Sequence, residues 1–392
     1  MSDPVPEAAS SSVSVWVPAG SRDEPPAAAG AFHFIEHLLF RGTTKRSAHE
    51  VNVAIDAVGG ELNAFTSKES TAFFARVPAD HTDLALDLLA EIILDPAFDA
   101  HDVDAEREVI LEELAMVNDA PDELAASLLD EALFPDHGLG WEVLGNAETL
   151  AAMALEELAA LHDAWYRRGR VVLAAAGAVD HDRLVEFASQ RFTHERRDGP
   201  FRSAPGHVMR PRLVVERDCE QVQVGLAWRG VAVSDSDRWP LAVLLHVLGE
   251  GPSSRLYREA RDERGLAYSI GTSFASYSDA GAVQLAYGAT PKHLDELGEV
   301  VEAQIAALLG EGITQEELRV GIGYLQGSLV LSVEDVGARM SRLGHNLVAE
   351  NRVESVSEVF AGLAAVTNDD VVRVADRVFG GTRAEVAVGP ID

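Results

Sequence analysis

The segment His33-Phe34-Ile35-Glu36-His37 carries two histidines four residues apart, with a glutamate directly before the second. On a helix, residues four apart share one face, so the two imidazoles can bind one cation together. The glutamate lies three residues after the first histidine and points near the same place. A carboxylate beside a metal-bound water can take the proton of that water, as hydrolysis requires. The pattern H-x-x-E-H is the reverse of the H-E-x-x-H zinc-peptidase signature.

The residues around this motif favour a buried site. A motif of five residues with three fixed positions also occurs by chance. The alternative to a metal site is a helix that carries one surface histidine and one core histidine. The motif lies in a largely apolar stretch from Phe32 to Phe40, and Gly42 follows as a helix stop. Burying imidazoles and a carboxylate there costs free energy unless a partner such as zinc binds them. We therefore expect a helix that holds a metal site.

A second predicted helix, at residues 103–117, offers a third ligand, because a catalytic zinc site takes three protein ligands and a water. Glu106 and Glu113 are seven residues apart, about two helical turns, whereas Glu112 is turned about 100° away from Glu113. The alternative is a solvated acidic face. Against it, both glutamates fall within an apolar stripe at helical spacing: Val103, Ile110, Leu114 and Val117.

Three segments closely resemble the pitrilysin/insulinase family of zinc peptidases, and most of all its bacterial members similar to the mitochondrial processing peptidase. They are H-F-I-E-H-L-L-F-R-G-T from His33, G-G-E-L-N-A-F-T-S-K-E-S-T from Gly59 and E-R-E-V-I-L-E-E-L from Glu106. The resemblance extends from about Val13 to Gly389. It implies that His33, His37 and Glu113 bind zinc, that Glu36 is the general base, and that Glu106 hydrogen bonds a ligand histidine.

A second cluster lies in the other half of the chain. A turn rich in glycine and serine at residues 249–254 precedes an arginine-rich predicted helix that ends at Gly265, and Tyr268 opens the next predicted strand. The residues alone also fit a solvated arginine-rich face with a packed tyrosine. The resemblance implies that Tyr268 donates a hydrogen bond to the oxyanion and that Arg261 holds substrate carbonyls.

The resemblance also suggests how a substrate is held. It implies that Asn63, Ala64 and Phe65 belong to an edge strand that pairs with the peptide, although an ordinary strand end is the alternative. Large relatives carry four such domains in one chain and this chain has two, so two copies would close a chamber. A homodimer is therefore expected. A heterodimer with a paralogue, or a non-catalytic scaffold, are the alternatives.

Composition limits the remaining possibilities. The net charge of −32, from 64 acidic and 32 basic residues, argues against nucleic-acid binding, which needs a basic patch to contact phosphates. No apolar run reaches the ~18 residues of a membrane span. The single cysteine, Cys219, excludes an internal disulfide bond. Residues 1–12 lack the features of a signal peptide, so a cytoplasmic location is expected.

The order of predicted elements indicates an α+β fold made of two similar domains, a degenerate duplication in which each domain has an antiparallel-rich sheet packed with helices. Residues 155–177 parallel residues 366–389, a helix followed by a strand in each case. We expect a zinc-binding domain at 1–192, a linker at 193–211 and a second domain at 212–392. Before Val13, either the first strand of the family is missing or the start of the sequence is misassigned. The remaining predicted strands are 13–17, 62–65, 71–77, 171–176, 221–228 and 384–388.

Overall fold

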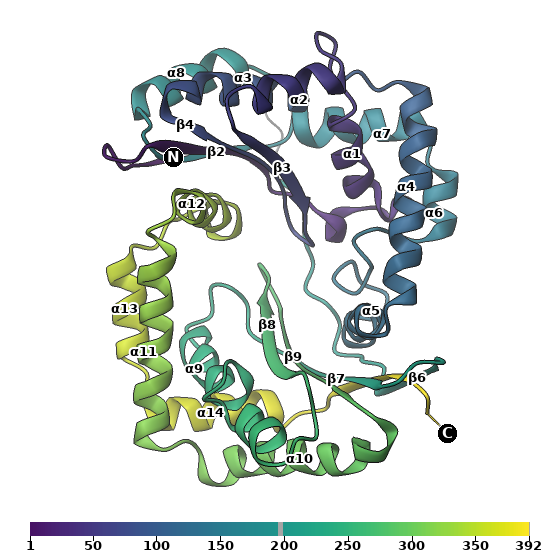
Figure 1. The fold of residues 1–392 in the computed structure, drawn as a ribbon, viewed down its shortest axis with the longest axis vertical. Helices are drawn as coiled ribbons and strands as arrows, with labels where there is room; N and C mark the ends of the chain where they lie inside the picture. The colour runs from purple at the N-terminus through teal and green to yellow at the C-terminus, as the bar shows by residue number, and fades with distance from the viewer. Residues whose placement is uncertain (195–198, 392) are drawn as a thin grey trace. The chain divides into compact units, whose positions relative to one another are not determined.

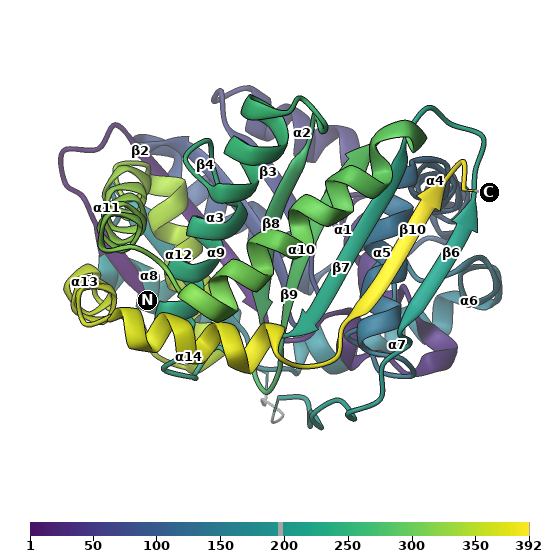
Figure 2. The same cartoon turned by 90° about the horizontal axis from the view of Figure 1, so that it is seen from below.

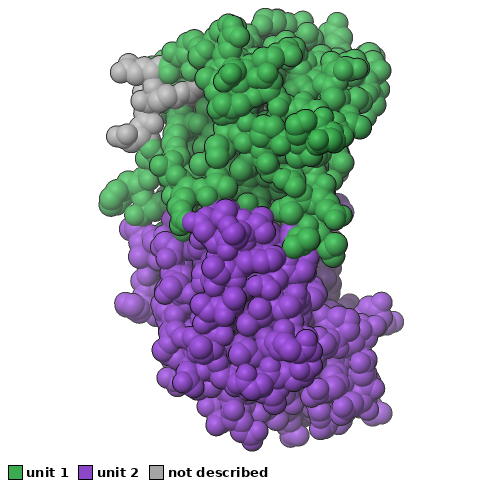
Figure 3. Space-filling model, turned by 90° about the vertical axis from the view of Figure 1, so that its left-hand side faces the viewer, with its two compact units in different colours: residues 1–115, 141–202, 330–353 green, residues 116–140, 203–329, 354–392 purple. Residues whose placement is uncertain are grey.

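The computed structural model describes residues 1–194 and 199–391. The chain divides into two compact units, coloured separately in Figure 3. Unit 1 comprises Met1–Ala115, Trp141–Arg202 and Val330–Val353, and unit 2 comprises Met116–Gly140, Ser203–Leu329 and Glu354–Asp392. Each unit is thus made of segments that are not continuous in sequence. One crossing, between residues 202 and 203, lies in the predicted linker, but each unit also contains a segment from the other half of the chain.

Unit 1 is built on a five-stranded sheet with the order β1-β5-β2-β4-β3. Its strands are β1 (Ser2–Pro4), β2 (Ser10–Val17), β3 (Glu61–Thr66), β4 (Thr71–Pro78) and β5 (Val172–Gly177). Only the β1–β5 pair is parallel. The helices that begin in this unit are α1 (Ala31–Leu39), α2 (Ala48–Asp56), α3 (Thr82–Leu94), α4 (Ala100–Asp119), α6 (Ala147–Ala152), α7 (Leu155–His162), α8 (His181–Arg191) and α12 (Val336–Glu350) (Figure 1).

Unit 2 repeats this plan, with a five-stranded sheet in the order β6-β10-β7-β9-β8 (Figure 2). Its strands are β6 (Arg212–Glu216), β7 (Val222–Arg229), β8 (Ile270–Ser276), β9 (Gly281–Ala289) and β10 (Ala384–Gly389). Again one edge pair, β6–β10, is parallel and the other pairs are antiparallel. The helices are α5 (Pro121–Leu133), α9 (Arg238–Gly249), α10 (Leu294–Glu311), α11 (Gln315–Ser332), α13 (Val356–Ala364) and α14 (Asn368–Phe379). The matching topology confirms the predicted α+β fold of two similar domains.

Two exchanged helices explain why the units are discontinuous. α12, from late in the chain, packs on β2 and β5 of unit 1, and α5, from early in the chain, packs on β7 and β10 of unit 2. A glycine permits close packing at each contact: a Cβ at Gly344 would lie 2.0 Å from the Trp16 ring, and one at Gly225 would lie 2.8 Å from Leu129. Each exchanged helix buries the sheet face that the other helices of its unit leave open.

Three local predictions need correction. A first strand does exist: β1 pairs with β5, and the amino group of Met1 donates to the carbonyl of Leu173 at 2.8 Å. Tyr268 precedes its strand, because β8 begins only at Ile270. The arginine-rich segment is a π-helical turn, Tyr257–Glu263, followed by Gly265 at φ 64°.

The other short helical turns are Ser21–Asp23, Pro26–Ala28, Ala79–His81, Asp163–Arg167 and Pro291–His293. Across residues 1–194 and 199–391, no helix is both long and apolar enough to cross a membrane.

Candidate metal centre

The motif helix α1 separates its apolar side chains from its polar ones. Phe32, Phe34, Ile35, Leu38 and Leu39 are buried in the core of unit 1. The remaining face presents the two histidines and the glutamate of the motif, all partly exposed. Since residues four apart lie one turn above each other, the two histidine rings meet, with their centroids 4.6 Å apart. The helix therefore fixes the spacing of both imidazoles before any metal binds.

The neighbouring helix α4 brings its two predicted glutamates to this face. Glu106 is buried, and its Oε2 lies 2.8 Å from Nδ1 of His37. Oε2 of Glu113 lies 3.6 Å from Nε2 of His37 and 3.9 Å from Nε2 of His33. Glu112 is exposed on the solvent face of α4, as its place on the helix predicted. Four residues predicted from the sequence thus converge.

The donor atoms of this group suit a zinc ion. Potential ligand atoms of His33, His37 and Glu113 all lie within 4.8 Å of one another. A tetrahedral ion held at about 2.0–2.1 Å spaces its ligands by about 3.4 Å, close to the separations observed. Because Glu106 accepts a hydrogen bond from Nδ1 of His37, the lone pair of the opposite nitrogen is directed toward Glu113. Two imidazoles and a carboxylate could therefore hold zinc with little rearrangement.

Burial tunes the ionisation of this face. Burial, together with the neighbouring His37, lowers the pKa of His33 to about 4, so its imidazole is neutral at pH 7 and its lone pair can bind a cation. Burial raises the pKa of Glu36, an effect opposed by a hydrogen bond from Thr66 and by His37. The Thr66 hydroxyl donates to Oε2 of Glu36 at 2.5 Å. Sequence analysis placed Thr66 at the end of the substrate segment Asn63-Ala64-Phe65-Thr66 but did not predict its contact with Glu36.

The predicted substrate strand lies beside this group. β3 is the edge strand of its sheet, paired with β4 on one side. Asn63 and Phe65 are exposed and Ala64 is partly buried, so alternate side chains face solvent. α1 packs against β3, and the contact between Thr66 and Glu36 places the end of this strand next to the motif.

The predicted arginine and tyrosine meet within unit 2. The guanidinium of Arg261 lies 5.2 Å from the ring centroid of Tyr268 and 4.8 Å from that of Tyr257. Cation–π contacts at these distances hold the arginine between the two rings. Tyr268 is 79% exposed. Tyr257 was not predicted, and its position four residues before Arg261 on a helical turn could have indicated the contact.

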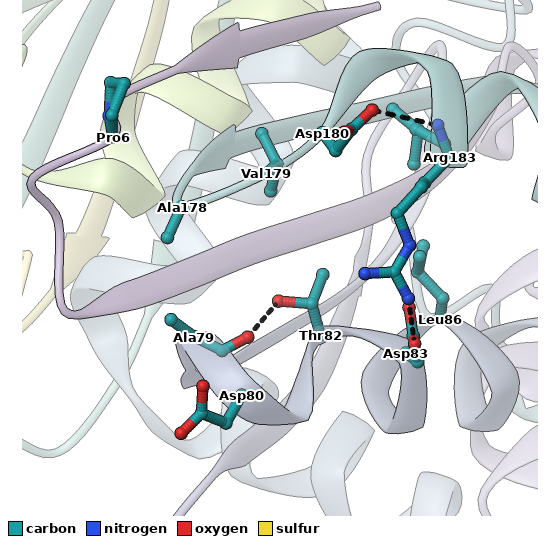
Figure 4. A pocket seen from close by; sticks show the side chains of 11 residues that line it. Pro6, Ala79, Asp80, Thr82, Asp83, Leu86, Ala178, Val179, Asp180 and Arg183 are labelled. Atoms are coloured by element: carbon teal, nitrogen blue, oxygen red, sulfur yellow. Dashed lines mark hydrogen bonds and ion pairs between the residues drawn. The ribbon is translucent and has the colours of Figure 1, made fainter.

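A cavity of about 460 Å³ lies elsewhere in unit 1 (Figure 4). Its lining includes the start of α3 and the segment that leads into α8. Arg183 of α8 pairs with Asp83 of α3, and Asp180 accepts hydrogen bonds from the N–H groups of Asp182 and Arg183. None of the predicted site residues lines it. The cavity is therefore separate from the metal-binding group.

Comparison with known proteins gives matches along most of the chain. Residues 2–147 match the family described as insulinase (peptidase family M16), and residues 152–322 match the peptidase M16 inactive domain. A Mycobacterium tuberculosis protein named as an uncharacterized zinc protease is 40% identical over 98% of this chain and 90% of the relative. A similarly named Streptomyces coelicolor protein is 36% identical over 100% of this chain and 87% of the relative.

Solved structures share the fold. The crystal structure of a peptidase M16 inactive domain from Pseudomonas fluorescens superposes with a TM-score of 0.93, covering 100% of this chain and 95% of that one. Its sequence identity is 20%, so this likeness concerns the fold alone.

Proposed function

Since the chain belongs to the insulinase family of peptidases, family M16, we propose that it is a zinc-dependent endopeptidase that hydrolyses peptides or small unfolded proteins. The observation that carries this proposal is the convergence of His33, His37 and Glu113 beside Glu36. Relatives that are named zinc proteases support the choice of metal. A zinc ion bound there would act as a Lewis acid that lowers the pKa of a water molecule.

The chain's own residues then have distinct tasks. Nε2 of both histidines and the carboxylate of Glu113 would hold the metal, and Glu106 keeps the proton of His37 on Nδ1. Glu36 takes the proton of the attacking water and delivers it to the leaving amine. The Thr66 hydroxyl holds Oε2 of Glu36, so we assign the proton transfer to Oε1.

Substrate binding is assigned to the two segments expected from the sequence. The open side of β3, at Asn63, Ala64 and Phe65, offers backbone N–H and C=O groups to an extended peptide. Tyr268 donates a hydrogen bond to the oxyanion, and Arg261 binds a substrate carbonyl. The exposure of Tyr268 supports this role, because the phenol is accessible to a ligand.

We further propose that two copies of the chain form a homodimer that encloses the substrate. One chain carries both the motif and the Arg261–Tyr268 pair, which favours a homodimer over a heterodimer with a paralogue. Light scattering of the purified, active protein tests this, and a fully active monomer would contradict it. The predicted domain limits and the cytoplasmic location remain predictions.

A non-catalytic scaffold is the second candidate, and one observation favours it: residues 152–322 match the inactive domain of the family. A digest of mixed peptides by the purified chain, read by mass spectrometry, separates the two. The peptidase predicts cleavage that a chelator stops and zinc restores. A scaffold predicts no cleavage under either condition.

A further inference from the structure

The first turn of α1 is capped by a residue well outside the helix. A helix N-terminus leaves backbone N–H groups without partners inside the helix. Glu24, in the preceding loop, accepts hydrogen bonds from the N–H of Gly30 at 2.8 Å and of Phe32 at 2.7 Å, one with each carboxylate oxygen. Its side chain is buried, with the residue 5% exposed. Burial raises the pKa of Glu24 to about 8, although the hydrogen bonds from Phe32 and Gly30 act to lower it. The cap therefore rests on these two hydrogen bonds and not on a full negative charge at pH 7.

The packing explains why the cap comes from a distance. The usual capping position is Gly30, which has a left-handed backbone with φ 95°. A Cβ there would lie 2.5 Å from the carbonyl oxygen of Leu144, and a Cβ at Gly145 would lie 2.2 Å from that of Ala29. No side chain fits at position 30, so a serine or aspartate could not cap the helix in the ordinary way.

Neighbouring contacts hold the loop that carries Glu24. The N–H groups of Ser21 and Arg22 donate to the carbonyls of Ser67 and Lys68 in the turn between β3 and β4. That turn directly follows Thr66, the partner of Glu36. The same loop therefore sets the start of α1 and the end of the strand that holds the general base.

Asp23 adds a second anchor to this loop. Its carboxylate accepts two hydrogen bonds from Arg202, at 2.9 and 2.7 Å. The bidentate geometry fixes the orientation of the carboxylate as well as its position. The loop that carries Glu24 is thus held by its contacts with the β3–β4 turn and with Arg202.

The two histidines depend on this cap to different degrees. His33 is the third residue of α1, within the turn that Glu24 caps, whereas His37 lies one turn later and is held by Glu106. In the described part of the chain, Nδ1 of His33 is buried and has no hydrogen-bond partner. Among the described residues, the His33 ring is therefore directed by the helix backbone, by packing against the His37 ring and by Glu113 near its Nε2, but by no hydrogen bond at Nδ1.

We propose that Glu24 is a positioning residue of the metal centre, which holds the first turn of α1 so that Nε2 of His33 faces Glu113. The inference rests on the proposed zinc site. It goes beyond it by assigning the geometry of one ligand to a residue that touches neither metal nor substrate. It also predicts that a high concentration of zinc compensates for the weaker zinc binding of a variant that lacks the Glu24 cap.

The test is zinc affinity, measured by competition with a chromophoric chelator, in the wild type and in Glu24→Gln. In Glu24→Gln an amide NH₂ group replaces one of the two accepting oxygens, so one backbone N–H at the start of α1 loses its partner. Loss of a helix cap changes an equilibrium by roughly 2- to 30-fold, and zinc binding is expected to weaken by about that factor. The visible spectrum of the cobalt-substituted protein should change. Saturating zinc should restore most of the hydrolysis rate, which it would not do after general damage to the fold.

A matched control is Glu50→Gln, which removes a carboxylate cap from α2 in the same unit, where Glu50 accepts from the N–H of Ser47 at 2.8 Å. This variant should keep wild-type zinc affinity. Glu24→Asp, which retains the carboxyl group but is one methylene shorter, should lie between the wild type and Glu24→Gln. Circular dichroism follows the fold of every variant.

The outcomes separate this inference from the proposed function. A wild type that binds zinc but hydrolyses nothing, with weakened binding in Glu24→Gln, supports the positioning role and contradicts the peptidase. Unchanged affinity in Glu24→Gln overturns the positioning role alone. Unfolding of both Glu24 variants also overturns it, since Glu24 would then support the whole unit, and a wild type that binds no zinc overturns both.

Discussion

Nδ1 of His37 lies 2.8 Å from Oε2 of Glu106, while the opposite nitrogen of the same ring lies 3.6 Å from Glu113. One imidazole thus joins two carboxylates that are two turns apart on α4. The inner carboxylate is buried and also lies 3.2 Å from Nε of Arg41, and the outer one is more exposed. This arrangement gives the two glutamates different roles, one in orienting a ligand and one in binding the metal.

Glu106→Gln should weaken zinc binding by about 10- to 100-fold, because the carboxylate that orients His37 is lost. Isothermal titration of the metal-free protein measures this. Glu108→Gln, an exposed position on the same helix, serves as the control and should match the wild type. Equal zinc affinity in the two variants would argue that the contact with His37 does not orient a ligand.

Glu113→Gln and the adjacent Glu112→Gln form a second matched pair. A metal that binds only the folded protein raises its stability by about 2.7 kcal/mol at a hundredfold excess over Kd. Chelator should therefore lower the melting temperature of the wild type and of Glu112→Gln, but leave Glu113→Gln unchanged. Calorimetry with and without chelator decides this, and a chelator-sensitive Glu113→Gln would remove Glu113 from the ligand set.

Tyr268→Phe should reduce kcat by about a hundredfold with little change in KM, since the phenol is proposed to act only on the developing oxyanion. Steady-state kinetics on a fluorogenic peptide measure both constants. Tyr324→Phe is the control, because Tyr324 belongs to the same unit and stacks on His246. A rise in KM at constant kcat would instead indicate that Tyr268 binds the ground state.

Glu317 provides a test of stability in unit 2. Burial raises the pKa of this carboxyl, but bonds from Arg255 at 2.7 and 2.8 Å and from the N–H of Thr314 outweigh burial and lower the pKa to about 2. The stabilisation is therefore complete above pH 4.5, where the unfolded chain also ionises, and is lost as pH falls from 4.5 through about 2.

Glu317→Gln should accordingly lower the free energy of unfolding by about 1–3 kcal/mol at pH 7. The difference from the wild type should shrink as pH falls below 4.5. Urea denaturation at pH 7, 4.5 and 3.5 measures it, with the exposed Glu316→Gln as a control that changes little. A difference that is constant over this range would show that the charge of Glu317 is not what stabilises the unit.

Much of the site could be predicted because its residues follow helical spacing. The separation of His33 and His37, and that of Glu106 and Glu113, place each pair on one helix face, and the structure brings these four residues together. Residue spacing does not predict a contact in which a side chain binds the backbone of a distant segment. Glu24 meets the N–H groups of Gly30 and Phe32, a contact made by the path of a loop and not by periodicity.

The fold was predictable within each half but not in the exchange of helices. The apolar stripes of α5 and α12 indicate that one face of each is buried, but not which sheet buries it. β1 was missed because three polar-flanked residues show no alternation, and its partner β5 lies far along the chain. The positions of α5, α12 and β1 all depend on contacts between segments that are distant in the sequence.

The most direct test of the central claim is Glu36→Gln, with zinc content and peptide hydrolysis measured on the same preparation. The account predicts about one zinc ion per chain, as in the wild type, because Glu36 is not among the proposed ligands. It also predicts that hydrolysis falls to background, because an amide cannot take the proton of the attacking water. A variant that binds zinc and hydrolyses peptides at the wild-type rate would contradict the account.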